Sequence, residues 1–95
     1  MDGRVWRVDR RTRLHWRRLD DAWLAFDAGS DDTHHFDSVS AAALMCLEAE
    51  PLALGQLAAT LARELDLPAG EGLATRLESL LAQLSELGLI EPVAP

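Results

Sequence analysis

The spacing of hydrophobic positions along the chain changes near Asp37. Before this residue, aromatic and aliphatic side chains come in short bursts at residues 5–8, 14–16 and 23–26, with charged residues between the bursts. All three tryptophans lie in these bursts. Short aromatic and branched runs between polar turns are typical of β-strands. We therefore predict three or four strands before Asp37.

A run of turn-forming residues, Ala28–Asp32, separates the apolar segment Trp23–Asp27 from Thr33–Phe36. Gly, Ser and Asp are common in turns because they accept unusual backbone angles or bond to the nearby backbone. The pattern predicts a β-hairpin over Trp23–Phe36. A small sheet has edge strands, and an unpaired edge can accept another extended chain unless neighbouring charges block it.

After Asp37 the hydrophobic residues recur at steps of three and four, which is the period of an amphipathic helix. One helix is expected from a cap at Asp37 or Ser38 to about Ala49, and a second over 54–65. A third helix, with a leucine stripe over 73–87, is expected to end at Gly88. Strands followed by helices indicate an α+β fold, because the strands are too close together for helical crossovers. We see one domain over residues 1–95.

The net charge of −7 belongs to the helical part of the chain. Residues 1–36 hold seven Arg and seven Asp, whereas residues 37–95 hold two Arg and nine acidic residues. An acidic helical part disfavours nucleic-acid binding, which needs a basic face, and favours a basic ligand. The sequence shows no membrane-spanning window and no secretory signal, and its single cysteine allows no internal disulfide. We expect a cytoplasmic protein.

The candidate reactive residues form no recognisable catalytic set. His34 and His35 are adjacent, so on a strand they point to opposite faces and cannot easily share a metal ion. Cys46 lies on an expected helix, where a free cysteine commonly packs as a small hydrophobe. No glycine-rich phosphate loop is present. We predict no catalytic residue, no metal site and no cofactor.

The order and spacing of four segments resemble a known family. The segments are Trp23–Asp37, which ends in Thr-His-His-Phe-Asp, then Ser40–Leu47, Leu57–Ala62, and Leu80–Pro92, which ends in Leu-Gly-Leu-Ile-Glu-Pro. They closely resemble the PqqD-like peptide chaperones, also called RiPP recognition elements. The chain is most similar to the branch found in the HPr kinase-related A system. The resemblance covers roughly residues 14–92.

This resemblance implies a winged-helix-like fold, with N-terminal antiparallel strands followed by a three-helix bundle. It also implies a non-catalytic chaperone that binds the leader of a ribosomally made precursor peptide as an added strand. The leader would lie between the third strand and the third helix and be presented to a modifying enzyme, such as an HPr kinase-related protein. The implied peptide-binding residues are Thr33, His34, His35 and Phe36 on the strand, and Arg76, Leu77, Leu80 and Gln83 on the helix.

Two features of the N-terminal part depart from or add to the family pattern. The branch usually has Gly where Asp31 stands, and we expect Gly29 to supply the positive φ of the turn instead. The additional segment 4–8 either pairs in the sheet or covers the edge that a peptide would need.

Two other functions fit the same pattern of elements. A winged-helix DNA-binding regulator also has three helices and a β-wing, but the second and third helices carry one Arg each, Arg63 and Arg76. A structural homodimer could use the leucine stripe of the third helix as its seam.

Overall fold

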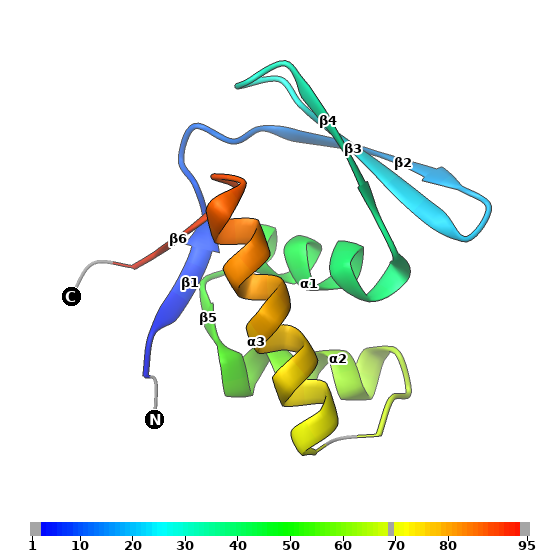
Figure 1. Cartoon of the computed structure of the whole chain (residues 1–95), viewed down its shortest axis with the longest axis vertical. Coiled ribbons are helices and arrows are strands. Elements are labelled where there is room, and N and C mark those ends of the chain that lie inside the picture. Colours follow the sequence, from blue (N-terminus) through cyan, green and yellow to red (C-terminus); the bar gives the residue numbers. More distant parts are fainter. Residues whose placement is uncertain (1–2, 69, 94–95) are drawn as a thin grey trace.

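Three of the four strands before Asp37 form an antiparallel meander. In the computed structural model, which describes residues 3–68 and 70–93, β2 (Leu14–Leu19), β3 (Ala22–Asp27) and β4 (Asp32–Phe36) make an antiparallel sheet in the order β2-β3-β4 (Figure 1). Trp23 lies opposite Phe36 and Asp27 opposite Asp32. The hairpin predicted over Trp23–Phe36 is therefore confirmed.

A second antiparallel sheet joins distant parts of the chain. Its central strand, β1 (Val5–Val8), pairs with β5 (Leu52–Ala53) on one side and β6 (Ile90–Pro92) on the other. The strand expected at residues 5–8 is present, but the sequence did not indicate β5 or β6. They are only two and three residues long, too short for an alternating pattern to show. The strands are thus not all placed before the helices.

Three helices follow as predicted: α1 (Ser38–Ala49), α2 (Leu54–Glu64) and α3 (Glu71–Glu86). The side chain of Asp37 caps α1 by accepting a hydrogen bond of 2.8 Å from the Ser40 N–H. The α+β class is confirmed. The helices do not pack only on one another, because α1 contacts β1 and the strands β3 and β4 as well as α2.

The core is built mainly from leucines of the helices. Trp6 of β1 and Ile90 of β6 complete it from the small sheet. The predicted leucine stripe of α3 points into this core at five of its positions. Fully buried side chains at its centre are those of Leu44, Leu57, Leu61, Leu77, Leu84 and Leu89.

The C-terminus of α3 ends as the sequence predicts. Gly88 adopts φ 77°, a left-handed angle that glycine reaches without strain. The Leu89 N–H donates to the Leu84 carbonyl and the Gly88 N–H to the Ser85 carbonyl, both at 3.0 Å, which is the pattern of a Schellman motif. This turn leaves Leu87 on the surface, 54% exposed, and directs Leu89 into the core.

Candidate functional site

The outer edge of β4 is unpaired. Within residues 3–68 and 70–93, β4 pairs with β3 alone. The N-terminal strand β1 lies in the other sheet, between β5 and β6, so it does not cover this edge (Figure 1). The alternative in which residues 4–8 block the edge is therefore wrong.

The opposite edge of the same sheet, on β2, is protected by charge. β2 carries two consecutive arginines, Arg17 and Arg18, whose side chains point to opposite faces of the strand. The Arg18 guanidinium lies 5.8 Å from the centre of the Trp23 ring. Charged side chains on an edge strand discourage pairing with another chain. β4 has one charged residue, Asp32 at its start, and none over Thr33–Phe36, so β4 is the edge with less protection.

A cleft of about 600 Å³ lies between β4 and α3. Its apolar surface comes from Phe36 of β4 and from leucines of α3, and polar side chains lie around its rim. The first turn of α1 closes one side through Ser40. The lining residues are His35, Phe36, Asp37, Ser40, Leu80, Gln83, Leu84, Glu86 and Leu87.

An ion pair marks one end of this cleft. Arg76 Nη2 on α3 lies 3.2 Å from Asp37 Oδ2, which follows β4 directly. The pKa of Asp37 is lowered, chiefly by the hydrogen bond from the Ser40 N–H and then by the Ser40 side chain and the charge of Arg76. The Asp37 carboxylate is therefore already engaged twice, as a helix cap and as an ion-pair partner.

The other end of the cleft lies beside the turn between β3 and β4. Leu87 lines both the cleft and an adjoining hollow of about 230 Å³, which is also bounded by Gly29, Ser30 and Asp32. The cleft thus borders the last two residues of β4, His35 and Phe36, and the hollow borders its first residue, Asp32.

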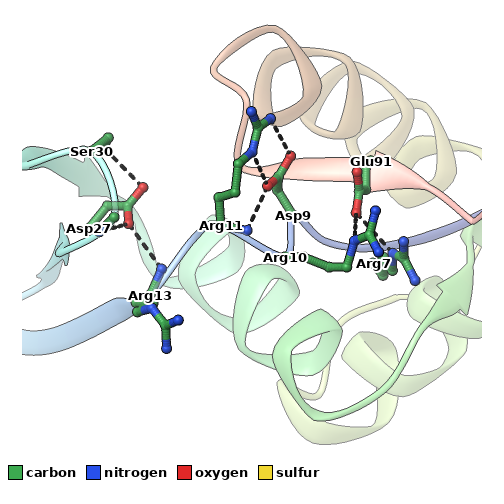
Figure 2. A network of polar contacts seen from close by, with 9 residues as sticks. Arg7, Asp9, Arg10, Arg11, Arg13, Asp27, Ser30 and Glu91 are labelled. Carbon is green, nitrogen blue, oxygen red and sulfur yellow. Dashed lines mark hydrogen bonds and ion pairs between the residues drawn. The ribbon is translucent and has the colours of Figure 1, made fainter.

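The carboxylate of Asp27 holds the turn at this end in place. It accepts hydrogen bonds from the Arg13 N–H at 3.0 Å, the Gly29 N–H at 2.8 Å and the Ser30 hydroxyl at 3.0 Å (Figure 2). Burial raises the pKa of Asp27, but the three hydrogen bonds outweigh burial, so the pKa lies below its ordinary value. The start of β4 is thus fixed by a buried, charged acceptor.

The positive φ of the turn is at Asp31, not at Gly29. Asp31 has φ 67°, a left-handed angle that Asp tolerates better than most residues, so the expectation for Gly29 is wrong. Glycine is needed at position 29 for a different reason: a Cβ there would overlap the carbonyl oxygen of Arg11.

The four implied positions on the strand alternate between its two faces. His35 and Phe36, the last two residues of the strand, point to opposite faces, but both border the cleft, which lies at this end of β4. His34 is half-buried on the inner face, where its ring stacks on Phe36 with centroids 6.0 Å apart. Thr33 is exposed on the outer face, in register with Phe26.

The four implied positions on the helix are not equivalent. Leu80 and Gln83 line the cleft, and Arg76 lies at its end. Leu77 points into the core with 0% of its surface exposed, so it cannot contact a ligand in this conformation. The sequence could not show this. The four-residue spacing from Leu73 to Leu77 places both leucines on one face of α3, but it does not show which part of that face meets the core and which part meets the cleft.

Sequence reasoning missed several lining residues. Leu84 and Leu87 lie four and seven residues after Leu80, so the same helical period that identified Leu80 also points to them. Glu86 and Ser40 had no signal in the sequence, because their place in the cleft depends on how α3 and α1 pack beside β4.

The remaining reactive side chains do not gather near the cleft. Cys46 is half-buried against the core, and burial raises the pKa of its thiol. No group of three His, Cys, Asp or Glu side chains among the described residues is arranged to hold a metal ion. Within the same residues, no helix has the length and apolar character needed to cross a membrane.

The cleft and the unpaired edge of β4 beside it are therefore the structural features on which an inference about function can be based. A comparison of the chain with protein-family models, with curated proteins and with solved structures finds no match.

Proposed function

We propose that this chain is a non-catalytic peptide-binding module of the PqqD-like kind. It takes the leader of a ribosomally made precursor peptide as an added strand on β4 and presents it to a modifying enzyme in the cytoplasm. The observation that carries the proposal is an unpaired strand edge, without charged residues over Thr33–Phe36, that ends beside a cleft with both leucine and polar side chains in its lining. The proposal assigns no catalytic residue, metal or cofactor to the chain, and the chemistry belongs to the partner enzyme.

The affinity would come from two sources. The free N–H and C=O groups of β4 would pair with the backbone of the peptide, which is independent of its sequence. Every second side chain of the peptide would then point between β4 and α3, where Phe36, Leu80 and Leu87 offer apolar surface. Backbone pairing supplies strength and these side-chain contacts supply selectivity.

The two alternative functions find less support in the fold. A DNA-binding regulator needs free cations on a recognition helix, and Arg76 of α3 is already paired with Asp37. A homodimer through the leucine stripe needs exposed leucines, but the stripe is buried at Leu73, Leu77, Leu80, Leu81 and Leu84, leaving only Leu87 exposed.

The direct test is calorimetric titration with synthetic peptides covering the short reading frames encoded next to this gene. Leu87→Glu places a charge in the cleft at an exposed position, where folding tolerates it. Loss of one leucine contact is expected to weaken binding roughly tenfold. Leu19→Glu is the matched control, because Leu19 is 39% exposed at the end of β2, outside the cleft.

Amide chemical shifts would locate the bound peptide independently. The largest changes are expected along β4, with β2 unaffected. Binding that leaves the β4 amides unchanged, or that Leu19→Glu weakens as much as Leu87→Glu, would refute strand addition at this edge. Salt-sensitive retardation of duplex DNA would restore the DNA-binding alternative, and sedimentation as a dimer would restore the homodimer.

A further inference from the structure

We infer that the peptide taken by this cleft carries two apolar side chains at alternating positions and a Lys or Arg beside them, at the end nearest the turn between β3 and β4. This inference rests on the proposed function and adds to it the chemical class of the ligand. It follows from the length of the apolar surface on α3 and from the carboxylates that remain unpaired around it.

The length of the apolar surface fixes the number of side chains. Leu80 of α3 and Leu87, the residue that caps its C-terminal end, mark its two ends, and seven residues of helix rise by about 10 Å. In an extended chain, side chains on the same face are about 6.7 Å apart. Two such side chains fit beside this surface, and a third would lie about 13 Å from the first, past its end.

The exposure of the leucines shows where these side chains gain contacts. Leu80 is 8% exposed and Leu84 1% exposed, so both lie at the base of the cleft and offer little surface to a ligand. Leu87 is 54% exposed and has the most surface to lose to a ligand. The apolar contact is therefore strongest at the Leu87 end.

The carboxylates without an ion-pair partner lie at the Leu87 end of the cleft, so this end carries negative charge. Glu86 borders the cleft, and Asp32 borders the adjoining hollow with Leu87. Neither carboxylate forms an ion pair within residues 3–68 and 70–93, whereas Asp37 at the opposite end is neutralised by Arg76.

The nearby arginine does not cancel this charge. Arg11 borders the hollow, but its guanidinium lies 3.1 Å from the Asp9 carboxylate and donates two hydrogen bonds to it (Figure 2). Glu86 and Asp32 therefore remain as the carboxylates available to a ligand, and opposite charge on the ligand is the complement that such a surface selects. A cationic side chain beside the second apolar residue would reach them.

The experiment is selection from a library of random eight-residue peptides displayed on phage, using the intact chain as bait. Wild-type protein is expected to enrich peptides with Leu, Ile, Val or Phe at two positions separated by one residue, and with Lys or Arg on one side of that pair. In a selected synthetic peptide, replacing this Lys or Arg by Glu is expected to weaken binding about tenfold at low salt, with less effect at 0.5 M salt.

Charge reversal of the protein gives the decisive comparison. Glu86→Arg should shift the selected charge from Lys or Arg towards Asp or Glu, while the apolar positions stay the same. Glu78→Arg is the matched control, because Glu78 is exposed on the same helix but does not line the cleft. It should select the same peptides as the wild type.

The possible failures separate the two proposals. Peptides that bind at β4 but show no charge preference, or a preference that Glu86→Arg leaves unchanged, overturn the ligand class and leave the proposed function standing. Failure to select any peptide, together with the absence of binding to the neighbouring reading frames, overturns both.

Discussion

The buried carboxylate of Asp27 supports the strongest prediction about stability. The residue is only 4% exposed, and its side chain accepts three hydrogen bonds, from the Arg13 N–H, the Gly29 N–H and the Ser30 hydroxyl. Asp27→Ala leaves these donors without the acceptor. At about 1 kcal/mol for each bond, with little water able to replace the carboxylate, the substitution should cost about 3 kcal/mol. In a domain of this size that corresponds to a fall in Tm of about 15 °C.

Asp27→Asn separates the hydrogen bonds from the charge. Oδ1 of Asp27 accepts both backbone N–H groups, and the amide oxygen of Asn can do the same. The new NH₂ group can donate to the Ser30 hydroxyl, which now donates to Oδ2. The cost should therefore be about 1 kcal/mol, from the loss of charge-assisted bonding.

The pH dependence gives the sign of the electrostatic part. The pKa of Asp27 in the folded protein lies below its ordinary value, so the carboxylate stabilises the fold above about pH 4 and loses this contribution as the pH falls through the folded pKa. The difference between wild type and Asp27→Asn should be constant from about pH 7 to 5 and shrink below about pH 4. Titrations of other carboxylates are common to both proteins and cancel.

Urea denaturation followed by tryptophan fluorescence measures these free energies. Trp16 and Trp23 lie on the same sheet as Asp27, and their rings are 6.1 Å apart, so their emission reports on the packing of that sheet. Equal destabilisation by Asn and Ala would show that charge, not hydrogen bonding, dominates at this site. A cost below about 1 kcal/mol for Ala would show that the turn does not depend on this acceptor.

Three further substitutions test local geometry by the same denaturation assay. Gly29→Ala places a Cβ against the Arg11 carbonyl and should cost more than 1 kcal/mol, with the amide shifts of the turn displaced; an unchanged midpoint would contradict the close approach. Asp37→Ala removes the cap that accepts from the Ser40 N–H and should cost about 1 kcal/mol, whereas Asp37→Asn should retain most of it. Asp31→Gly relieves the left-handed φ of 67° and should stabilise the fold by roughly 0.5–1 kcal/mol; a loss of stability would show that the Asp31 side chain contributes more than its backbone strain costs.

Local features of the fold were predictable because short-range physics determines them. The turn-forming run Ala28–Asp32 located the hairpin, Asp37 located the start of α1, and Gly88 located the end of α3. Each depends on residues a few positions apart, through caps and turns with strong residue preferences.

The second sheet was not predictable because its pairing is long-range. Leu52–Ala53 and Ile90–Pro92 become strands only because β1 lies between them, and their sequences alone carry no alternating pattern. The turn at Asp31 shows a similar limit at short range. Either Gly29 or Asp31 satisfies the residue preference for positive φ, and the structure has the positive φ at Asp31. The need for glycine at position 29 comes instead from the Arg11 backbone, which belongs to another segment.

The candidate site was predictable in outline but not in detail. The helical period of α3 identified the stripe to which Leu77, Leu80 and Leu87 all belong. Their exposed fractions of 0%, 8% and 54% depend on where α2 and β6 pack against that helix and where the cleft beside β4 begins. Periodicity gives the direction of a side chain, whereas the neighbours decide whether it meets the core or the cleft.

The position of β1 has a consequence for how the protein folds as it is synthesised. Trp6 lies opposite Leu52 on one side and Pro92 on the other, and Arg7 forms an ion pair of 3.0 Å with Glu91, 84 positions later (Figure 2). While the ribosome makes residues 9 to 51, β1 has neither of its partner strands, and it acquires the second only when β6 has been made. The meander β2-β3-β4 does not require later parts of the chain for its strand pairing, since its contacts are local. Closing so long a loop is slow compared with forming a hairpin, so we expect the core around Trp6 to be completed after the local contacts of the meander, and with them the strand edge on β4, have formed.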